Sequence, residues 1–600
     1  MVTVVEVNYE DICSVETLRM AWEQIKAKGG PDSLLVDVFE NIDYEFDLNR
    51  NLGVISRRLR TRRYRPRPVR HIPTTKGGGL TRPVVTLSLD DAIVSQAIIY
   101  KLAPYLDKRL ISGVFSMRAT GKAKKPFRGW YRDWPKYQKK LQGMLDDSWL
   151  VISDITGYFD NIDLRILKEQ LLRLEHVDSD IVDLVLFVLE SWMFRQLYGM
   201  PIGRGIPQAD LDFPQALSNF FLYEHDRRMD KFTDGKYIRW VDDMNIVVGS
   251  ELEGKRVIRE LEESLKFQFL TPNSSKTRIL GPEEILDYFL FEENDYLTEF
   301  ESRLKTHQKS KQPTAGLEEE LVDRFRCFTN RKRDGSWEKV LKRYYTAFKR
   351  LNSHFLIDRV SEDLLTRPSM DSKIRQYMLR IDFQPDMVDI VVGYLNSEQN
   401  MYPSTESQLV RLLMDLRIPT DTSTGPITEL ASRLLFGDGA QSWYIRCLAA
   451  MLIAKYGVMS DTRKIAAYLA DSGDNLDEGD LRRHLLAVSL LLPATDSDFN
   501  RAMLYSRGQE DTALSRVVHF YDEALKWDSL PQLVKSRLTL KKLEAPKRKF
   551  LGMGTFLLLR LLCWNSRLHS DLRGPVRKIA KENEDPQMTG KIEDLAREIA

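Results

Sequence analysis

The sequence has few cysteines and lacks a long apolar run. Its four cysteines lie far apart and form no C-x-x-C pair: Cys13, Cys327, Cys447 and Cys563. We therefore expect isolated, buried thiols, and neither a disulfide framework nor a cysteine zinc site. The most apolar stretch, residues 555–564, is interrupted by Arg560. It is far shorter than the ~20 residues of a membrane-spanning helix, so we predict that the protein does not cross a membrane.

A leader pattern and an excess of one charge are also missing. The first residues carry Glu6, Glu10 and Asp11 and show no basic start before an apolar stretch. We therefore expect no secretory signal and a cytoplasmic location. The net charge of +2 gives no global sign of a polyanionic partner. Residues 57–82, however, hold nine Arg, one Lys and no acid, together with Tyr64 and several prolines, which favours an extended segment near a polyanion.

The chain divides into two parts by its hydrophobic pattern. Short β-rich runs alternate with helical segments in the first part, which predicts an α+β domain over residues 1–302. The polar stretch 303–316 is predicted to be a linker. Residues 317–600 read as helical almost throughout. Between residues 443 and 492, short amphipathic helices start roughly 19 residues apart, so a pair approaches the ~40–47 residues of a HEAT or armadillo unit. This spacing favours stacked, HEAT-like helical hairpins, and an irregular helical bundle fits it equally well.

Two acidic residues interrupt the β-prone segments 237–241 and 244–248. Only Asp242 and Asp243 separate these segments, which predicts a tight hairpin. Asp-Asp is a poor turn sequence because such turns favour residues that tolerate positive φ. A turn whose residues depart from this preference indicates that the tip of the hairpin has a function.

A third acid, Asp154, follows the apolar run 149–152 and precedes Gly157, so it too sits at a strand end. If the strands are neighbours in one sheet, Asp154 and Asp242 converge and form a cluster of negative charge that requires divalent cations. Oxygen ligands suit Mg²⁺. Two such ions, about 3.5–4 Å apart, would activate an attacking 3′-hydroxyl and stabilise a pyrophosphate leaving group.

These segments resemble the reverse transcriptase family. VISDITGYFDNID resembles the first palm motif, and RWVDDMNIVV resembles the Tyr-x-Asp-Asp motif, with Trp240 in place of Tyr. GIPQADLDFPQALSNFFL resembles the Gly-x-Pro-Gln-Gly motif, and TPNSSKTRIL the motif that carries a lysine near the triphosphate. YRPRPVRHIPTTKGGGLTRPVV and GVFSMR resemble the fingers. The segments follow the family order over about residues 60–290, which is highly specific as a set.

The resemblance implies a right-hand polymerase fold with fingers and palm, followed by the helical part. It implies two Mg²⁺ ions, or Mn²⁺, on Asp154, Asp242 and Asp243. Lys276 would protonate the pyrophosphate. The implied nucleotide-binding residues are Lys76 and Arg82 on the phosphates, Phe159 as the gate against a 2′-hydroxyl, and Gln208. Ala209 stands where the family has Gly, and the motif around it is about one residue longer than usual, which puts template handling in doubt.

A polymerase core with a long helical half is similar to the prokaryotic abortive-infection and unknown-group reverse transcriptases of phage defence. In that group the helical half replaces a thumb, the enzymes form homo-oligomers, and some make DNA primed from a protein hydroxyl, with or without a template. The implied partners are dNTPs, the DNA product, and an RNA template or noncoding RNA. Two alternatives stay open: a catalytically idle scaffold that binds RNA or a protein, and a mobile-element reverse transcriptase.

Overall fold

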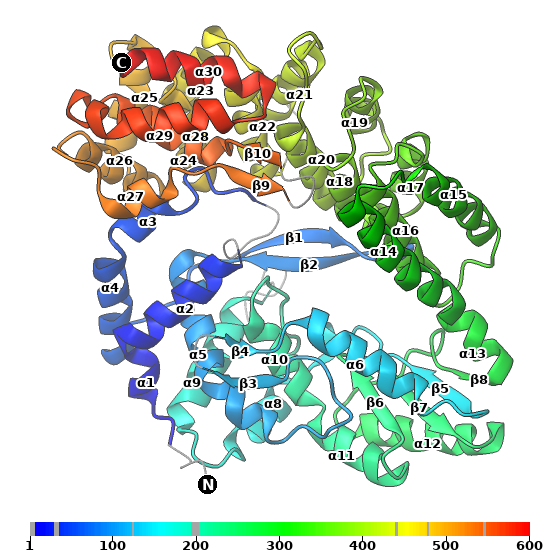
Figure 1. Cartoon of the computed structure of the whole chain (residues 1–600). Coiled ribbons are helices and arrows are strands. Elements are labelled where there is room, and N and C mark those ends of the chain that lie inside the picture. Colours follow the sequence, from blue (N-terminus) through cyan, green and yellow to red (C-terminus); the bar gives the residue numbers. More distant parts are fainter. Residues whose placement is uncertain are drawn as a thin grey trace.

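An α+β part and a helical part make up the molecule, with a β hairpin between them. The structure is a computed structural model that describes residues 6–28, 35–122, 125–193, 203–437, 442–476, 479–543 and 548–600. In Figure 1 the α+β part lies below and the helical part lies above and to the right. The hairpin of β1 (Arg70–Thr75) and β2 (Thr81–Thr86) projects across the middle.

A four-stranded antiparallel sheet forms the palm. Its strands lie in the order β6 (Tyr237–Trp240), β7 (Asp243–Val248), β5 (Trp149–Ser153), β8 (Arg278–Leu280). The register pairs Ser153 with Met244. Asp154, the next residue of the chain, therefore leaves the sheet at the edge where Asp243 enters it. Sheet register alone brings two distant acids to one place.

Strand β5 is buried on both faces. Leu150 and Ile152 join a cluster with α6 (Trp130–Gln142) and α13 (Pro282–Phe289), whereas Val151 joins the core beneath α12 (Glu251–Lys266). Successive side chains point to opposite faces of a strand, so a strand covered on both sides needs a continuous apolar run. This is why LVI carries no polar alternation.

Helices surround the sheet and the fingers hairpin. The central helix α5 (Leu89–Asp107) is capped by Ser88, whose Oγ accepts the N–H of Asp91 at 3.2 Å. The remaining elements of this part are α1 (Tyr9–Cys13), α2 (Val15–Ala27), α3 (Ile42–Phe46), α4 (Leu48–Arg60), β3 (Ala119–Lys122), β4 (Lys125–Phe127), α7 (Tyr158–Asn161), α8 (Leu164–Leu172), α9 (Ser179–Ser191), α10 (Asp212–Phe221) and α11 (Tyr223–Phe232).

The helical part is built from two rows of alternate helices. In one row each helix packs on the next, in the order α16, α18, α20, α22, α24, α26. In the other row α17, α19 and α21 pack in succession, and α23 packs on α25. Stacked helical hairpins produce such contacts, and their HEAT-like nature stays a prediction. The bounds are α16 (Trp337–Leu351), α17 (Val360–Thr366), α18 (Asp371–Met378), α19 (Asp386–Asn396), α20 (Pro403–Asp415), α21 (Gly425–Phe436), α22 (Trp443–Tyr456), α23 (Met459–Ser472), α24 (Gly479–Ser489), α25 (Ser497–Arg507) and α26 (Thr512–Ala524). The chain ends with α27 (Gln532–Arg537), β9 (Lys541–Leu543), β10 (Arg548–Phe550), α28 (Met553–Cys563), α29 (His569–Glu582) and α30 (Pro586–Glu598).

Helix α22 differs from the amphipathic helix that its sequence suggested. Nearly all of its circumference is buried, from Tyr444 to Tyr456. The reason is tertiary: α20, α21, α24, α28 and α30 all pack against it. A helix covered on every side has no polar face to maintain.

The predicted linker 303–316 is largely helical. Helix α14 spans Phe291–Ser310 and α15 spans Ala315–Thr329, so only a short turn separates them. Polar straight-chain residues are good helix formers, so high polarity did not break the helix. Leu304 is buried in the core of the helical part, and Arg303 pairs with Glu320 at 2.5 Å. The boundary between the core of the palm and the core of the helical part therefore lies nearer to residue 290.

The N-terminal segment crosses to the helical part. Phe39 lies in the core of the helical part, and α3 packs on α26. Arg483 of α24 is fully buried, pairs with Asp43 at 2.7 Å and also binds Asp37. The two parts of the molecule are thus joined by a buried ion cluster as well as by the chain.

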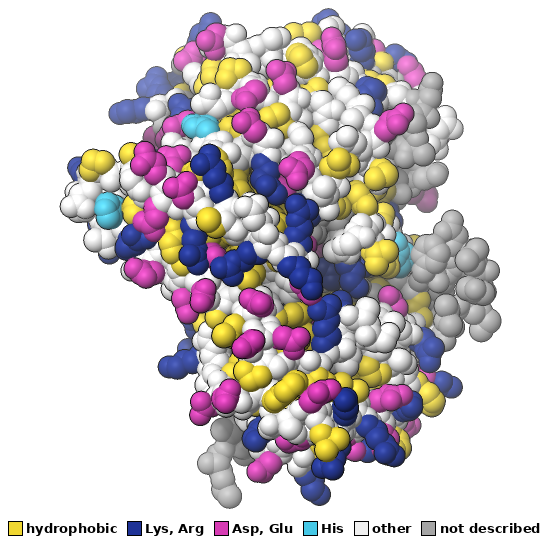
Figure 2. Space-filling view, turned by 90° about the vertical axis from the view of Figure 1, so that its right-hand side faces the viewer, with side chains coloured by type: hydrophobic (Ala, Val, Ile, Leu, Met, Phe, Trp, Pro, Cys, Tyr) yellow, Lys and Arg dark blue, Asp and Glu magenta, His cyan; other side chains and the backbone are white. Residues whose placement is uncertain are grey.

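The surface matches some of the expectations from composition. Cys13, Cys447 and Cys563 are buried, but Cys327 is exposed on α15, which corrects the expectation for that thiol. Among the described residues, no helix combines the length and apolarity needed to span a bilayer. Figure 2 shows Lys and Arg side chains gathered across the middle of the face that lies at the right of Figure 1.

Replacing Arg483 with Ala should destabilise the fold strongly. Removal leaves the buried carboxylate of Asp43 with only its longer contact to Arg516 at 3.7 Å, which costs about 3–5 kcal/mol of unfolding free energy. Denaturant unfolding followed by circular dichroism measures the change. The control is Arg501→Ala, which removes an exposed pair with Asp471 and should change the free energy by less than about 1 kcal/mol. Equal effects of the two substitutions would contradict the assignment.

Candidate active site

One cleft contains all the site residues that the sequence singled out. It has a volume of about 720 Å³ and lies between the palm sheet and the fingers hairpin. The predicted residues that line it are Lys76, Arg82, Asp154, Phe159, Gln208, Asp242, Asp243 and Lys276. They come from segments up to two hundred residues apart, so tertiary folding brings them together.

The β6–β7 hairpin has a strained tip. Trp240 pairs with Asp243, so the two turn residues are Val241 and Asp242, one position earlier than the sequence predicted. Val241 has a φ of 57°. This left-handed conformation is unfavourable for a β-branched residue, with a cost on the order of 1–3 kcal/mol. The strain falls on the residue next to Asp242, which the surrounding structure must hold in place.

A buried polar network holds Val241. Its N–H donates to Ser116 Oγ at 3.1 Å, and its carbonyl accepts from the guanidinium of Arg239. Arg239 is fully buried and pairs with Asp226 at 2.6 Å. Asn219 Oδ1 accepts from both Arg239 at 3.0 Å and Ser116 at 2.7 Å. The network therefore fixes both backbone polar groups of the strained residue.

The carboxylates at the sheet edge repel one another. Burial, followed by the charges of Asp154 and Asp243, raises the pKa of Asp242 to about 7. The Asp243 side chain is exposed to the cleft, yet its partial burial among the surrounding protein atoms raises its pKa. The charge of Lys339 opposes this shift, and the charge of Asp154 adds to it. Such crowded negative charge is stabilised by cations.

A lysine is the cation that the structure places beside Asp154. Lys276 Nζ donates to Asp154 Oδ2 at 2.9 Å, and Asn273 Nδ2 donates to the same oxygen at 3.2 Å. Burial lowers the pKa of Lys276, but the hydrogen bond to Asp154 and the nearby acids outweigh it, so the pKa is raised. Lys276 therefore carries its charge at the carboxylate.

The acids offer only oxygen atoms to a metal. Among the residues that the structure describes, no three His, Cys, Asp or Glu side chains already stand in a metal-binding arrangement. The donor chemistry fits Mg²⁺ nevertheless, because Asp154, Asp242 and Asp243 supply hard oxygens and their mutual repulsion would be relieved by a dication. These three residues are the ones that could hold it.

The fingers hairpin presents two cations to the cleft. Lys76 and Arg82 flank its tip, which is closed by the Lys76 N–H donating to the Leu80 carbonyl at 2.7 Å. Gly78 and Gly79 have φ values of 72° and 75°, which the tight turn requires.

Backbone contacts fix Gln208 and Phe159 near these cations. Val85 of the fingers donates its N–H to the Gln208 carbonyl at 2.7 Å. Ile206 donates to the Phe159 carbonyl at 2.8 Å. Gly205, with φ of 97°, allows this close approach, since a Cβ there would lie 3.3 Å from the Asp160 carbonyl. Residues 205–208 therefore pack against α7.

Several contributors to the cleft escaped the sequence analysis. Lys339 comes from α16 in the helical part, and Trp134 of α6 packs on the motif residue Trp240 with ring centroids 5.0 Å apart. The helical part also holds the fingers tip: Tyr402 OH donates to the Gly79 carbonyl at 3.0 Å. These residues lie far from the motifs, and no local pattern marks them.

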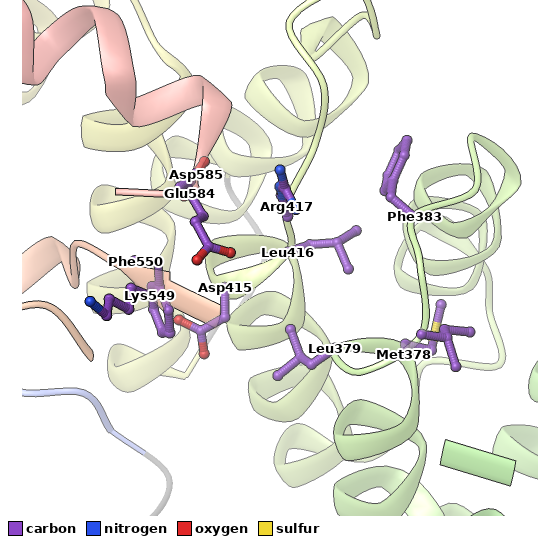
Figure 3. A pocket seen from close by; sticks show the side chains of 11 residues that line it. Met378, Leu379, Phe383, Asp415, Leu416, Arg417, Lys549, Phe550, Glu584 and Asp585 are labelled. Atoms are coloured by element: carbon purple, nitrogen blue, oxygen red, sulfur yellow. The ribbon is translucent and has the colours of Figure 1, made fainter. Parts of the chain in front are cut away.

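A second hollow lies within the helical part (Figure 3). Three of its charged groups already have partners: Asp585 pairs with Lys455 at 2.8 Å, Lys549 pairs with Glu582 at 2.6 Å, and Asp415 pairs with Arg375. Side chains with satisfied charges and no shared acid cluster have a structural role, so we assign no chemistry to this hollow.

Comparison with known proteins assigns the class. Residues 74–293 match the family model described as reverse transcriptase (RNA-dependent DNA polymerase). Protein YkfC of Escherichia coli (strain K12) is 23% identical over 277 residues, which cover 40% of this chain and 69% of that protein. The chain carries a reverse transcriptase domain, and the protein is a nucleotidyltransferase of the RNA-directed DNA polymerase class.

Replacing Ser116 with Ala should slow catalysis while the fold is retained. The Val241 N–H loses its acceptor, so Asp242 is less well positioned, and we expect kcat for DNA synthesis to fall about tenfold, equivalent to ~1.4 kcal/mol. Steady-state kinetics should show little change in KM for the nucleotide. Ser116→Thr keeps the hydroxyl and should restore most of the rate; equal losses in both variants would argue against the hydrogen bond.

Proposed function

We propose that this protein is a DNA polymerase that adds deoxynucleotides at the cleft between palm and fingers. The single observation that carries the proposal is that Asp154, Asp242 and Asp243 line the same cleft as Lys76 and Arg82. Acids and phosphate-binding cations in one cleft suit phosphoryl transfer to a nucleoside triphosphate.

Each residue has a role in this proposal. Asp154, Asp242 and Asp243 would hold two Mg²⁺ ions, which when bound would supply electrostatic stabilisation of the phosphoryl transfer. Lys76 and Arg82 bind the triphosphate, and Gln208 lies along the incoming nucleotide. Lys276, a charged group beside Asp154, donates a proton to the departing pyrophosphate. An incoming triphosphate competes with Asp154 for this ammonium.

Purified protein with Mg²⁺ and dNTPs should incorporate labelled nucleotide, and Asp242→Ala should abolish incorporation. The loss is expected to exceed about a thousandfold, since the electrostatic stabilisation of the reaction depends on the acids. A matched control is Asp146→Ala, which alters an exposed Asp-Asp pair outside the cleft. Equal activity of Asp242→Ala and the parent would reject the assignment. Mg²⁺ should also raise the thermal unfolding midpoint of the parent more than that of Asp242→Ala.

Phe159 is proposed to select the sugar. The ring lies partly exposed in the cleft, where a 2′-hydroxyl would meet it. Phe159→Ala should raise the ratio of ribonucleotide to deoxynucleotide incorporation by about tenfold or more, because removal of a steric clash of ~1.4 kcal/mol has that effect. Incorporation of dNTPs in the same assay is the internal control. An unchanged ratio would remove the gate role.

We further propose that the enzyme acts in antiphage defence, as a homo-oligomer, with synthesis primed from a protein hydroxyl or independent of a template. The support is the resemblance to the abortive-infection and unknown-group enzymes, together with a helical part that contacts the fingers at Gly79 and the palm strand β8 through the Arg278–Asp334 pair. Protein isolated from cells should carry covalently attached DNA, whose sequence would identify the product. Protein without attached DNA would exclude priming from the protein.

Expression of the protein in a bacterial host should reduce phage plating, and Asp242→Ala should remove the protection. Protection by the variant equal to that of the parent would favour a binding scaffold over a polymerase. Light scattering of the purified protein tests the oligomeric state.

A further inference from the structure

A basic groove runs beside the active-site cleft. It lies between the β3–β4 hairpin and the start of α6 and is about 360 Å³ in volume. We define the basic groove by five exposed cations that line it: Lys122, Lys125, Arg128, Arg132 and Lys136. Among the described lining residues Asp133 is the one acid, and it pairs with Lys136 at 3.2 Å. The groove therefore keeps a strong positive charge.

The basic groove opens into the cleft. Arg128 and Asp133 line both the groove and the cleft that contains Asp154, Asp242 and Asp243. A polyanion lying in the groove would therefore have a direct path to the reacting groups. None of the nucleotide-binding residues proposed above lies in the groove, so its charge is not used in binding the triphosphate.

Two large aromatic side chains stand exposed at the groove. Trp130 is 72% exposed and lines the cleft, and Tyr131 is 53% exposed, with ring centroids 6.4 Å apart. Lys125 Nζ lies 5.7 Å from the centroid of the Tyr131 ring and donates to its hydroxyl at 3.3 Å. Exposed aromatic faces among cations are the surface on which unpaired bases stack while their phosphates are neutralised.

The groove is held rigidly against the catalytic hairpin. On the opposite face of α6, Tyr137 is buried and its hydroxyl binds Asn245 of β7. Trp134 of α6 packs edge-on against Trp240 of β6. Because α6 is fixed to the strands that present Asp242 and Asp243, a strand bound in the groove is held at a constant position relative to the acids.

We propose that the basic groove binds a single-stranded nucleic acid, with its bases on Trp130 and Tyr131 and its phosphates on the five cations, and guides it along the active-site cleft. This inference rests on the proposed polymerase function. A duplex does not fit the observation, because its bases are already stacked and cannot use the exposed rings. The strand is either an RNA or DNA template or the growing DNA, since these share the same recognition chemistry.

The test is fluorescence anisotropy of the full chain with labelled oligo(U), oligo(dT) and a duplex of equal length. Trp130→Ala combined with Tyr131→Ala should weaken single-strand binding about thirtyfold or more, because two stacking surfaces are lost and each contributes about fivefold at least. Arg128→Ala combined with Arg132→Ala should reduce the slope of log affinity against log salt by about 1.4, as expected for two phosphate contacts.

Controls lie elsewhere on the surface. Leu252 and Phe267 are 61% and 70% exposed on α12 and just beyond it, so Leu252→Ala combined with Phe267→Ala should leave binding unchanged. Tighter binding of oligo(U) would identify an RNA template as the strand, and tighter binding of oligo(dT) would identify a DNA strand. A competing acidic peptide should not displace either oligonucleotide at equal charge concentration.

Three results would overturn the inference: unchanged affinity in the aromatic variant, tighter binding of the duplex, or displacement by the peptide that depends on the same two rings. Nucleotide incorporation measured in parallel separates this inference from the proposed function. Full incorporation with unchanged binding in the variants rejects the groove alone. If the parent binds single strands through the two rings but incorporates no nucleotide, the groove inference is supported and the proposed polymerase function is rejected.

Discussion

The buried ion pair between Arg239 and Asp226 is the interaction on which the active site depends. Neither side chain is accessible to solvent, so the cost of removing both charges from water is offset only when all of their hydrogen bonds are made. Arg239 uses its remaining donors on Asn219 and on the carbonyl of Val241. The pair thereby holds a β-branched residue in a left-handed conformation and aims Asp242 into the cleft.

The helical part follows the polymerase domain in sequence and also contacts it in space. Tyr402 and Ser404 bind the fingers hairpin at Gly79 and Thr75, and Lys339 acts on the charge of Asp243. The N-terminal segment also contacts the helical part, because Asp43 pairs with Arg483 of α24. Direct polar contacts therefore join the helical part to the fingers and to the N-terminal segment.

Much of the fold was predictable where a local pattern had a single explanation. The apolar run of β5 and the two-residue spacing of the hairpin indicated buried strands and a tight turn, and the family match confirms the enzyme class. Predictions failed where packing overrode composition. Polar residues 303–310 continue a helix because Leu304 is buried, and α22 has no polar face because helices surround it.

The identity and order of the chemical groups can be read along the chain: three acids at strand ends, a basic fingers segment and a lysine after the palm. Their spatial relations follow from the fold: Asp154 lies beside Asp243, Lys276 donates to Asp154, and Trp130 and Tyr131 stand exposed. Side-chain identity is local, whereas distance, burial and mutual charge depend on strand register and on contacts between residues hundreds of positions apart.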